Sequence, residues 1–184
     1  MHIVNYLQKK RSLLLVLFIG LCCSTQAQLQ RNIFGLELAR STKANVIAYL
    51  NEHNIQYKGM GEFDAISTKE DLYFAGYAWN VVIFQFYQNI LYGISLFQYP
   101  YMINSFGDIE DDRNFVDKRF QQIQKQLRNK YPSVEYIIEN PQSSIVLRDN
   151  MTVVTLNGLE NGEALVLGYM DRRLARMVRD GSDL

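Results

Sequence analysis

The spacing of apolar residues changes along the chain, and each spacing predicts a different element. In residues 41–54 (STKANVIAYLNEHN) the apolar positions recur at helical intervals behind Ser41, which fits an N-cap. Asn54 fits the left-handed position after a last turn, so that Ile55 would pack back over the helix. We therefore predict a short amphipathic helix whose inner face holds Val46, Ile47, Leu50 and His53.

A second and longer helix is predicted over residues 112–131. Asp112 can cap its start, and Pro132 follows its end because a residue before proline disfavours the helical conformation. Its apolar residues are spaced by four, three and four positions, which is the spacing of a single helical face. They are Val116, Phe120, Ile123 and Leu127.

Alternating and β-branched residues predict strands in most of the remaining chain. The aromatic stretch 78–99 contains two apolar runs separated by Gln88-Asn89, which predicts a hairpin. Further strands are predicted over 134–139, 144–157 and 163–178, with a turn near Asp149-Asn150. The end of the last segment (MDRRLARMVRD, 170–180) also fits a C-terminal helix, because its apolar residues suit the helical repeat as well as the alternation of a strand.

These elements predict an α+β domain, with helices packed on an antiparallel sheet. The ranges 36–104 and 108–180 resemble each other: each has a helix, then strands, then a hairpin. The hairpins compared are VVIFQFYQNILYGIS and LVLGYMDRRLARMV. One interpretation is two tandem α-β-β-β units that share one sheet within a single domain, residues 28–184. The other is chance similarity between two common arrangements of a helix and a meander.

The N-terminus predicts export. Three basic residues are followed by an apolar run of eleven, Leu13 to Cys23, which is too short to span a bilayer. Thr25 and Ala27 occupy the small-residue positions of a signal-peptide cut before Gln28. A lipoprotein is less favoured, because neither cysteine follows a small residue, and an uncleaved anchor is the third alternative. We predict a secreted or periplasmic domain.

Removal of residues 1–27 changes both the cysteine content and the charge. The mature 157 residues would hold no cysteine, so a core alone must stabilise the fold. Sixteen basic residues would remain against 19 acidic ones, a net charge of about −3. Nucleic-acid binding proteins usually show a basic excess, so we expect no nucleic-acid partner. No transmembrane helix is expected after leader removal, and no cofactor motif is found.

The sequence predicts no catalytic residue. Nucleophilic catalysis needs an oriented base beside Ser, Cys or Thr, and the mature chain has a single histidine, His53, expected at a helix C-terminus. The loop 107–113 gathers weak candidates for a metal site, although its spacing is not that of a calcium loop. These are Asp108, Glu110, Asp111 and Asp112, and acidic residues also favour a helix N-terminus without any metal.

Two features are candidates for binding. Aromatic residues are dense between positions 73 and 101, and Tyr99 and Tyr101 flank Pro100 in a predicted loop, where tyrosine often anchors interfaces. The C-terminal segment is basic. Its Arg172, Arg173, Arg176 and Arg179 either protect a sheet edge or bind an acidic protein or a lipid phosphate.

Two stretches also support a family resemblance. Residues 41–50 (STKANVIAYL) are similar to a G-M-[ST]-x-x-x-V-x-x-L helix opening, and Trp79 to Tyr87 form an aromatic strand before a turn. Behind a secretory leader, this layout resembles the β-lactamase-inhibitor-protein-like fold, which includes small outer-membrane lipoproteins of the barrel-assembly machinery. Ala39-Arg40 replaces the Gly-Met of that opening, and a lipobox cysteine is missing. The resemblance implies a binding module without catalysis.

Three functions remain as hypotheses at this point. The first is a non-catalytic secreted or periplasmic module that binds a protein or envelope component. The second is a hydrolase that acts on glycan or cell wall through a carboxylate pair, which requires two carboxylates about 5–10 Å apart in a groove. The third is a secreted hydrolase inhibitor, which follows from the fold resemblance alone.

Overall fold

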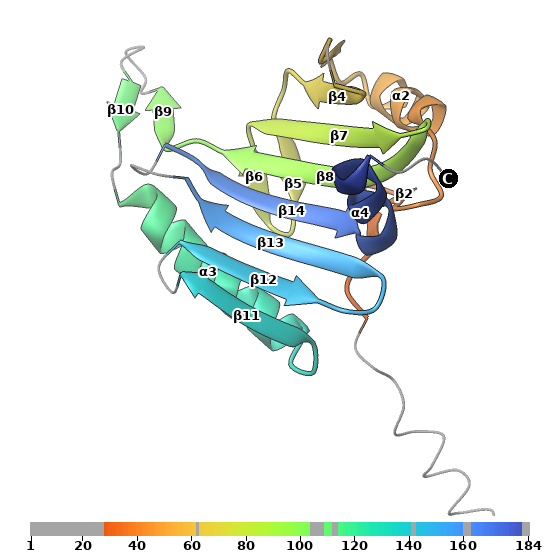
Figure 1. Ribbon diagram of the computed structural model, residues 1–184. Helices are drawn as coiled ribbons and strands as arrows, with labels where there is room; N and C mark the ends of the chain where they lie inside the picture. Colours follow the sequence, from red (N-terminus) through yellow and green to blue (C-terminus); the bar gives the residue numbers. More distant parts are fainter. Residues whose placement is uncertain are drawn as a thin grey trace, which may run out of the picture.

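The structure, a computed structural model, describes residues 28–61, 63–103, 109–111, 114–140, 143–159 and 163–181 (Figure 1). The described residues contain three helices, α2 (Lys43–Glu52), α3 (Phe115–Lys130) and α4 (Arg172–Asp180). No described helix has the length and apolar content needed to cross a membrane. The fold is α+β, as predicted. The predicted leader, residues 1–27, lies outside the described residues.

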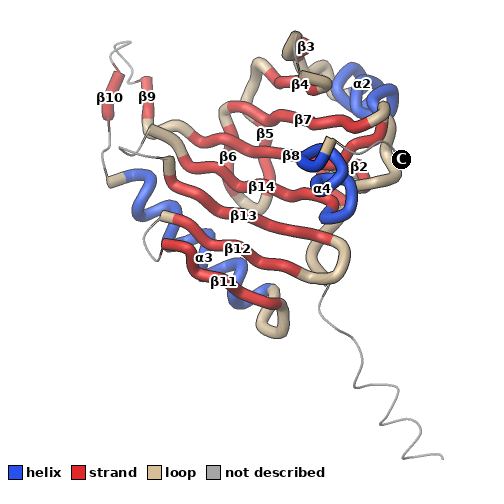
Figure 2. The backbone as a smooth tube through the Cα atoms, in the orientation of Figure 1, coloured by secondary structure: helices blue, strands red, loops and turns tan. Residues whose placement is uncertain are grey.

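One antiparallel sheet of eight strands forms the body of the molecule (Figure 2). Its strands run in the spatial order β11-β12-β13-β14-β8-β7-β4-β3. They are β3 (Tyr57–Gly59), β4 (Ala65–Thr68), β7 (Val81–Tyr87), β8 (Ile90–Gln98), β11 (Glu135–Asn140), β12 (Ser144–Arg148), β13 (Thr152–Gly158) and β14 (Leu165–Asp171).

The main sheet has two halves with the same order of elements. In the first half α2 precedes β3, β4, β7 and β8, and in the second half α3 precedes β11, β12, β13 and β14. The last strands of the halves, β8 and β14, pair at the centre. Each half thus has four strands, one more than the predicted unit. Three small hairpins complete the fold: β1 (Asn32–Ile33) with β2 (Leu36–Glu37), β5 (Leu72–Phe74) with β6 (Tyr77–Trp79), and β9 (Tyr101–Ile103) with β10 (Ile109–Asp111).

The predicted strand at the C-terminus is wrong, and its helical alternative is correct. β14 ends at Asp171, and residues 172–180 form α4. Asp171 caps this helix by accepting from the Leu174 N–H at 2.9 Å, and Gly181 ends it in the left-handed conformation. The predicted hairpin LVLGYMDRRLARMV is therefore β14 followed by a helix. The hairpin partner of β14 is β13.

Helix α2 ends as its sequence predicts. Asn54 is left-handed, with φ of 55°, and the Ile55 N–H donates back to the Leu50 carbonyl at 2.8 Å. The start is shifted by one residue, because Thr42 and Asn45 form a capping box while the Ser41 hydroxyl accepts from the Glu37 N–H. Val46 and Leu50 are buried as predicted, whereas His53 is exposed and packs on Tyr49.

Helix α3 buries the four predicted residues, Val116, Phe120, Ile123 and Leu127. Its N-cap is Asn114, and the predicted cap Asp112 lies outside the described residues. The helix stops at Lys130, two residues before Pro132. Its buried residues join those of α2 and the inner side of the sheet in one core.

The predicted hairpin turn at Gln88-Asn89 is present. Both residues have positive φ, 47° and 68°, which is the type I′ geometry that matches strand twist. The turns Phe34-Gly35 and Ala75-Gly76 share this geometry, and in each the second residue is glycine. Gln88 and Asn89 adopt it without a glycine.

Candidate binding surface

The two faces of the main sheet differ in their cover. On strand β7, Val82, Phe84 and Phe86 are buried, and the residues between them are half-buried. The buried set belongs to the core under α2 and α3. Helix α4 lies on the opposite side from α3, over the end where β14 stops and β8 begins (Figure 1). Among the described helices, α4 is the one that covers this second face, and it covers only one end.

Strand register defines the composition of this uncovered face. We call open face the outward side chains of the five strands β7, β8, β14, β13 and β12. Residues opposite each other across these strands form three rows, each from β7 to β12. The rows are Val81, Phe97, Val166, Asn157, Ser144; Ile83, Ser95, Gly168, Thr155, Val146; and Gln85, Gly93, Met170, Val153, Arg148.

The open face is nearly free of charge. Arg148, at the β12 margin, is its one charged member. Val81, Phe97 and Val166 are half-buried and adjacent in the first row, and in the middle row Ile83 and Val146 are separated by Ser95, Gly168 and Thr155. A centre depleted of charge with charged groups at the margin is the usual composition of a protein–protein interface.

Gly93 and Gly168, on the two central strands of the open face, leave room for neighbouring side chains to lie over the backbone. A Cβ at Gly93 would lie 2.5 Å from the Gln85 side-chain oxygen, and one at Gly168 would lie 2.7 Å from the Thr155 hydroxyl. The Gln85 and Thr155 side chains thus lie against the backbone of the neighbouring strands. The polar floor they create can accept or donate hydrogen bonds to a bound surface.

Helix α4 places the four predicted arginines beside the open face. Arg172 is half-buried and donates to the Asp149 carbonyl at 3.0 Å, and Arg179 pairs with Asp180 at 3.0 Å. Arg173 and Arg176 are exposed, and neither has an ion-pair partner among the described residues. The buried Leu174 anchors the helix to the sheet. The arginines therefore form a basic margin at one end of a nearly uncharged face.

Arg31 fixes the N-terminal segment to the strands that lead into α4. Its Nη2 donates to the Asp171 carboxylate at 2.7 Å and to the Leu38 carbonyl at 2.9 Å. Its Nη1 donates to the Met151 carbonyl at 3.0 Å and the Thr152 hydroxyl at 3.1 Å. Asp171 is buried, and it also caps α4, so one carboxylate couples the N-terminal segment to the basic helix.

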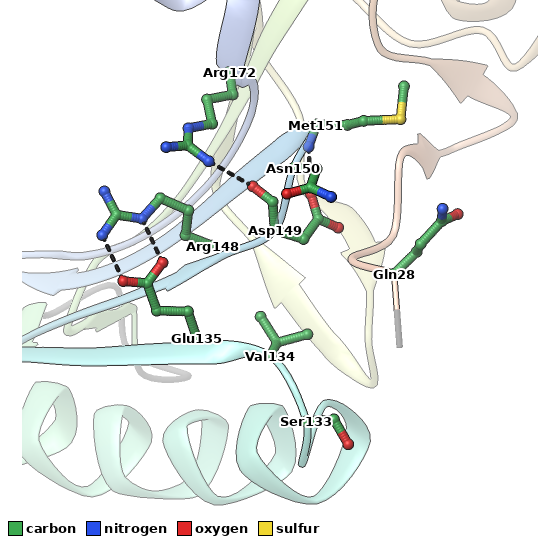
Figure 3. A pocket seen from close by; sticks show the side chains of 9 residues that line it. All are labelled: Gln28, Ser133, Val134, Glu135, Arg148, Asp149, Asn150, Met151 and Arg172. Carbon is green, nitrogen blue, oxygen red and sulfur yellow. Dashed lines mark hydrogen bonds and ion pairs between the residues drawn. The ribbon is translucent and has the colours of Figure 1, made fainter. Parts of the chain in front are cut away.

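A hollow of about 360 Å³ lies between α4, the β12–β13 turn and the start of β11 (Figure 3). We call it the arginine hollow, because Arg148 and Arg172 both line it. Arg148 holds Glu135 by two bonds, from Nε at 2.9 Å and from Nη2 at 2.8 Å. These hydrogen bonds lower the pKa of Glu135, slight burial opposes them, and the charges of Arg148 and Arg172 lower it further.

Asp149 closes the turn beside this hollow. Its carboxylate accepts from three backbone N–H groups, those of Leu29 at 2.7 Å, Met151 at 2.8 Å and Thr152 at 2.6 Å. A second hollow on the other side of the turn contains Glu37 and Asp171. Glu37 pairs with Arg40 at 3.2 Å, and Asp171 pairs with Arg31. The carboxylates of both hollows are thus already bound.

The predicted tyrosines and arginines do not form one site. Tyr99 follows β8 at the end where Leu165 pairs with Gln98, whereas Arg172 follows the other end of β14, a strand of seven residues. At about 3.3 Å per residue, roughly 23 Å of strand separates them. Tyr99 is partly exposed and its N–H donates to Asn80, and the Tyr101 side chain lies outside the described residues.

The candidate metal loop is only partly described. Asp108 and Asp112 lie outside the described residues, and the backbone of Glu110 and Asp111 belongs to β10. Within the described ranges, no group of three or more His, Cys, Asp or Glu side chains is placed to hold a metal ion.

Sequence reasoning missed Arg31, Arg148, Asp149 and Asp171, which build the basic end of the molecule. Two of them had a local signal, Asp149 as an aspartate at a predicted turn and Asp171 as a possible helix N-cap. Comparison of the chain with models of protein families, with curated proteins and with solved structures finds no match.

Proposed function

We propose that this domain is a non-catalytic binding module that acts outside the cytoplasm, secreted or periplasmic, and holds a protein partner on its open face. The observation that supports this most strongly is a half-buried, nearly uncharged sheet face that the described helices cover at one end only. The four spacings of about 4.8 Å between its five strands, and four residue steps of about 3.3 Å along them, give this face roughly 19 Å by 13 Å between Cα atoms. An area of this order is within the few hundred Å² of apolar patch that ordinary monomers expose, so the proposal is supported by the low charge and the missing cover of this face and not by its size.

The partner that fits has an apolar centre and acidic residues on one side. Arg173 and Arg176 are exposed and unpaired among the described residues, at the α4 margin of the open face. Complementary charge at an interface margin orients the partner and speeds association. Inhibition of a hydrolase, which the resemblance to inhibitor-type modules implies, is one form that such binding would take.

The hydrolase alternative has less support. General acid–base chemistry on a glycan needs two carboxylates with distinct, available protonation states. In the two hollows beside the β12–β13 turn, Glu135, Asp149 and Asp171 are each bound by arginine or by backbone N–H groups. No observation of the described residues favours catalysis over binding.

The test is quantitative capture of a partner from native envelope extract by residues 28–184. Four proteins are compared: the native domain, the open-face variant Ile83→Glu/Val166→Glu, the helix variant Arg173→Glu/Arg176→Glu, and a control, Tyr73→Glu. Tyr73 is 80% exposed on β5, outside the open face. Its substitution also replaces a large side chain by glutamate, but at a site away from the open face. Each variant must first show native circular dichroism and an unchanged melting temperature.

We expect the native domain and Tyr73→Glu to capture the same protein in stoichiometric amount by cross-linking. The open-face variant should lose it, and the helix variant should bind at least about tenfold more weakly and with less dependence on salt. Equal capture by all four proteins would contradict the assigned face. Lack of any stoichiometric partner, together with hydrolysis of a glycan by the native domain, would favour the enzyme alternative.

A further inference from the structure

We infer that the arginine hollow binds a small oxyanion, of the carboxylate or phosphate type, through the free N–H groups of Arg148 and Arg172. This inference goes beyond the proposed function and does not depend on it, because the oxyanion would bind the isolated domain without any protein partner. The hollow lies at one corner of the open face, where Arg148 ends the third row and α4 begins.

The geometry leaves donors available in the hollow. A guanidinium has five N–H donors in a planar fork. Arg148 uses one edge of its guanidinium, Nε and Nη2, to bind Glu135. Its Nη1 has no acceptor among the described residues. Arg172 gives one bond, from Nη1 to the Asp149 carbonyl, and its Nε and Nη2 have no described acceptor. Two cations therefore line one hollow with most of their donors unused.

The two carboxylates of the hollow are already engaged, so they do not compete for the unused arginine donors. Glu135 is neutralised by Arg148, to which it is bound at both oxygens. The negative charge of Asp149 is stabilised by three backbone N–H groups of the turn and the N-terminal segment. The two arginines and the two carboxylates of the hollow sum to no net charge, so an oxyanion would be held by the unused arginine N–H donors and not by an excess of positive charge.

The size and the other walls restrict the ligand. Arg forks match the two oxygens of a carboxylate or phosphate. The volume of about 360 Å³ exceeds that of a bare phosphate, and Met151 and Val134 add apolar wall. The oxyanion that fills the site is therefore one attached to a larger organic group, while inorganic phosphate is the simplest probe.

The test is a titration of residues 28–184 followed by nuclear magnetic resonance of the arginine Nε–H signals and the backbone amides. The probes are inorganic phosphate, acetate and phenyl phosphate, each against sodium chloride of the same ionic strength. Vesicles with and without phosphatidylglycerol separate a free oxyanion from a lipid headgroup. The variants are Arg172→Gln, Glu135→Gln and a control, Arg179→Gln, which removes an exposed arginine that bonds only its neighbour among the described residues.

We expect saturable shifts confined to Arg148, Arg172 and the amides around the hollow, with phenyl phosphate tighter than phosphate. Arg172→Gln should weaken binding about tenfold, the scale of a lost charge-assisted hydrogen bond. Glu135→Gln should tighten it several-fold, because it removes a like charge and leaves one neutral acceptor for Arg148 in place of two carboxylate oxygens. Arg179→Gln should change nothing.

Opposite outcomes would overturn the inference. Shifts that do not saturate, or that spread over all arginines in proportion to ionic strength, would show general screening and no site. Weaker binding in Glu135→Gln would show that the hollow does not select anions. Binding to anionic vesicles without binding to free oxyanions would replace the small-ligand site by a membrane surface.

Discussion

The two faces of the eight-stranded sheet come from the same alternation of residues but meet different surroundings. On the inner face Phe84, Leu96 and Leu156 are completely buried beneath α2, α3 and the small hairpins. On the open face their neighbours Ile83, Phe97 and Val166 stay half-buried although they are equally apolar. Side chains alternate between the two faces of a strand, so the sequence predicts which residues share a face. Whether another layer covers that face depends on the rest of the fold.

The sharpest test of this difference is a matched pair of substitutions. Phe84→Ala should lower the free energy of unfolding by about 3–5 kcal/mol, because it removes a fully buried ring and leaves a cavity. Phe97→Ala, on the open face of the adjoining strand, should cost about 1–2 kcal/mol, mainly through partial burial and β-propensity. Urea denaturation of both variants measures the difference. Equal losses that depend on protein concentration would show that a second copy covers the open face.

Glycine substitutions sharpen the comparison within the open face itself. Gly168→Ala would place its Cβ 2.7 Å from the Thr155 hydroxyl, and the β-branched Thr155 has little freedom to move, so we expect a loss of about 1–2 kcal/mol. Gly93→Ala meets the end of the flexible Gln85 side chain and should be nearly neutral. Thr155→Ala should rescue Gly168→Ala in a thermal-unfolding cycle. Additive losses would mean that backbone strain, and not this contact, decides the cost.

The smallest effect is expected at the charged margin of the open face. The Arg148 hydrogen bonds lower the pKa of Glu135, so this pair stabilises the fold above the ordinary glutamate pKa of about 4.3 and loses that contribution as pH falls through the lowered value. A carbon-detected titration of the Glu135 carboxyl should show a midpoint below the ordinary glutamate value of about 4.3. Arg148→Gln should raise the midpoint. An unchanged midpoint would show that the ion pair does not persist in solution.

Much of the fold could be predicted because its signals are local. The spacing of apolar residues in α3, the Schellman ending of α2 and the Gln88-Asn89 turn each depend on a few neighbouring residues. The C-terminal segment was ambiguous because its apolar residues suit two periods. The signals that separate them were present: Asp171 can cap a helix and Gly181 can end one.

The candidate sites depend on register and tertiary contacts, which the sequence does not display. Arg31 reaches Asp171 across 140 positions, and the Leu29 N–H reaches Asp149 across 120. Tyr99 and Arg172 are both beside central strands, yet antiparallel pairing sends them to opposite ends. The open face could be anticipated only in part: consecutive aromatics Phe86 and Tyr87 must point to opposite sides, but the missing cover was not predictable.

The central pairing of β8 with β14 has a consequence for the order of folding. Most ladders of the main sheet join strands that are close in the sequence, such as β12 with β13, so each half can form from local contacts. The six residue pairs between β8 and β14 instead join residues about seventy positions apart. Closing that long loop costs chain entropy before any contact compensates it. Formation of this central seam should therefore limit the folding rate, and substitutions in β8 or β14 should slow refolding more than equally destabilising ones in the outer hairpins.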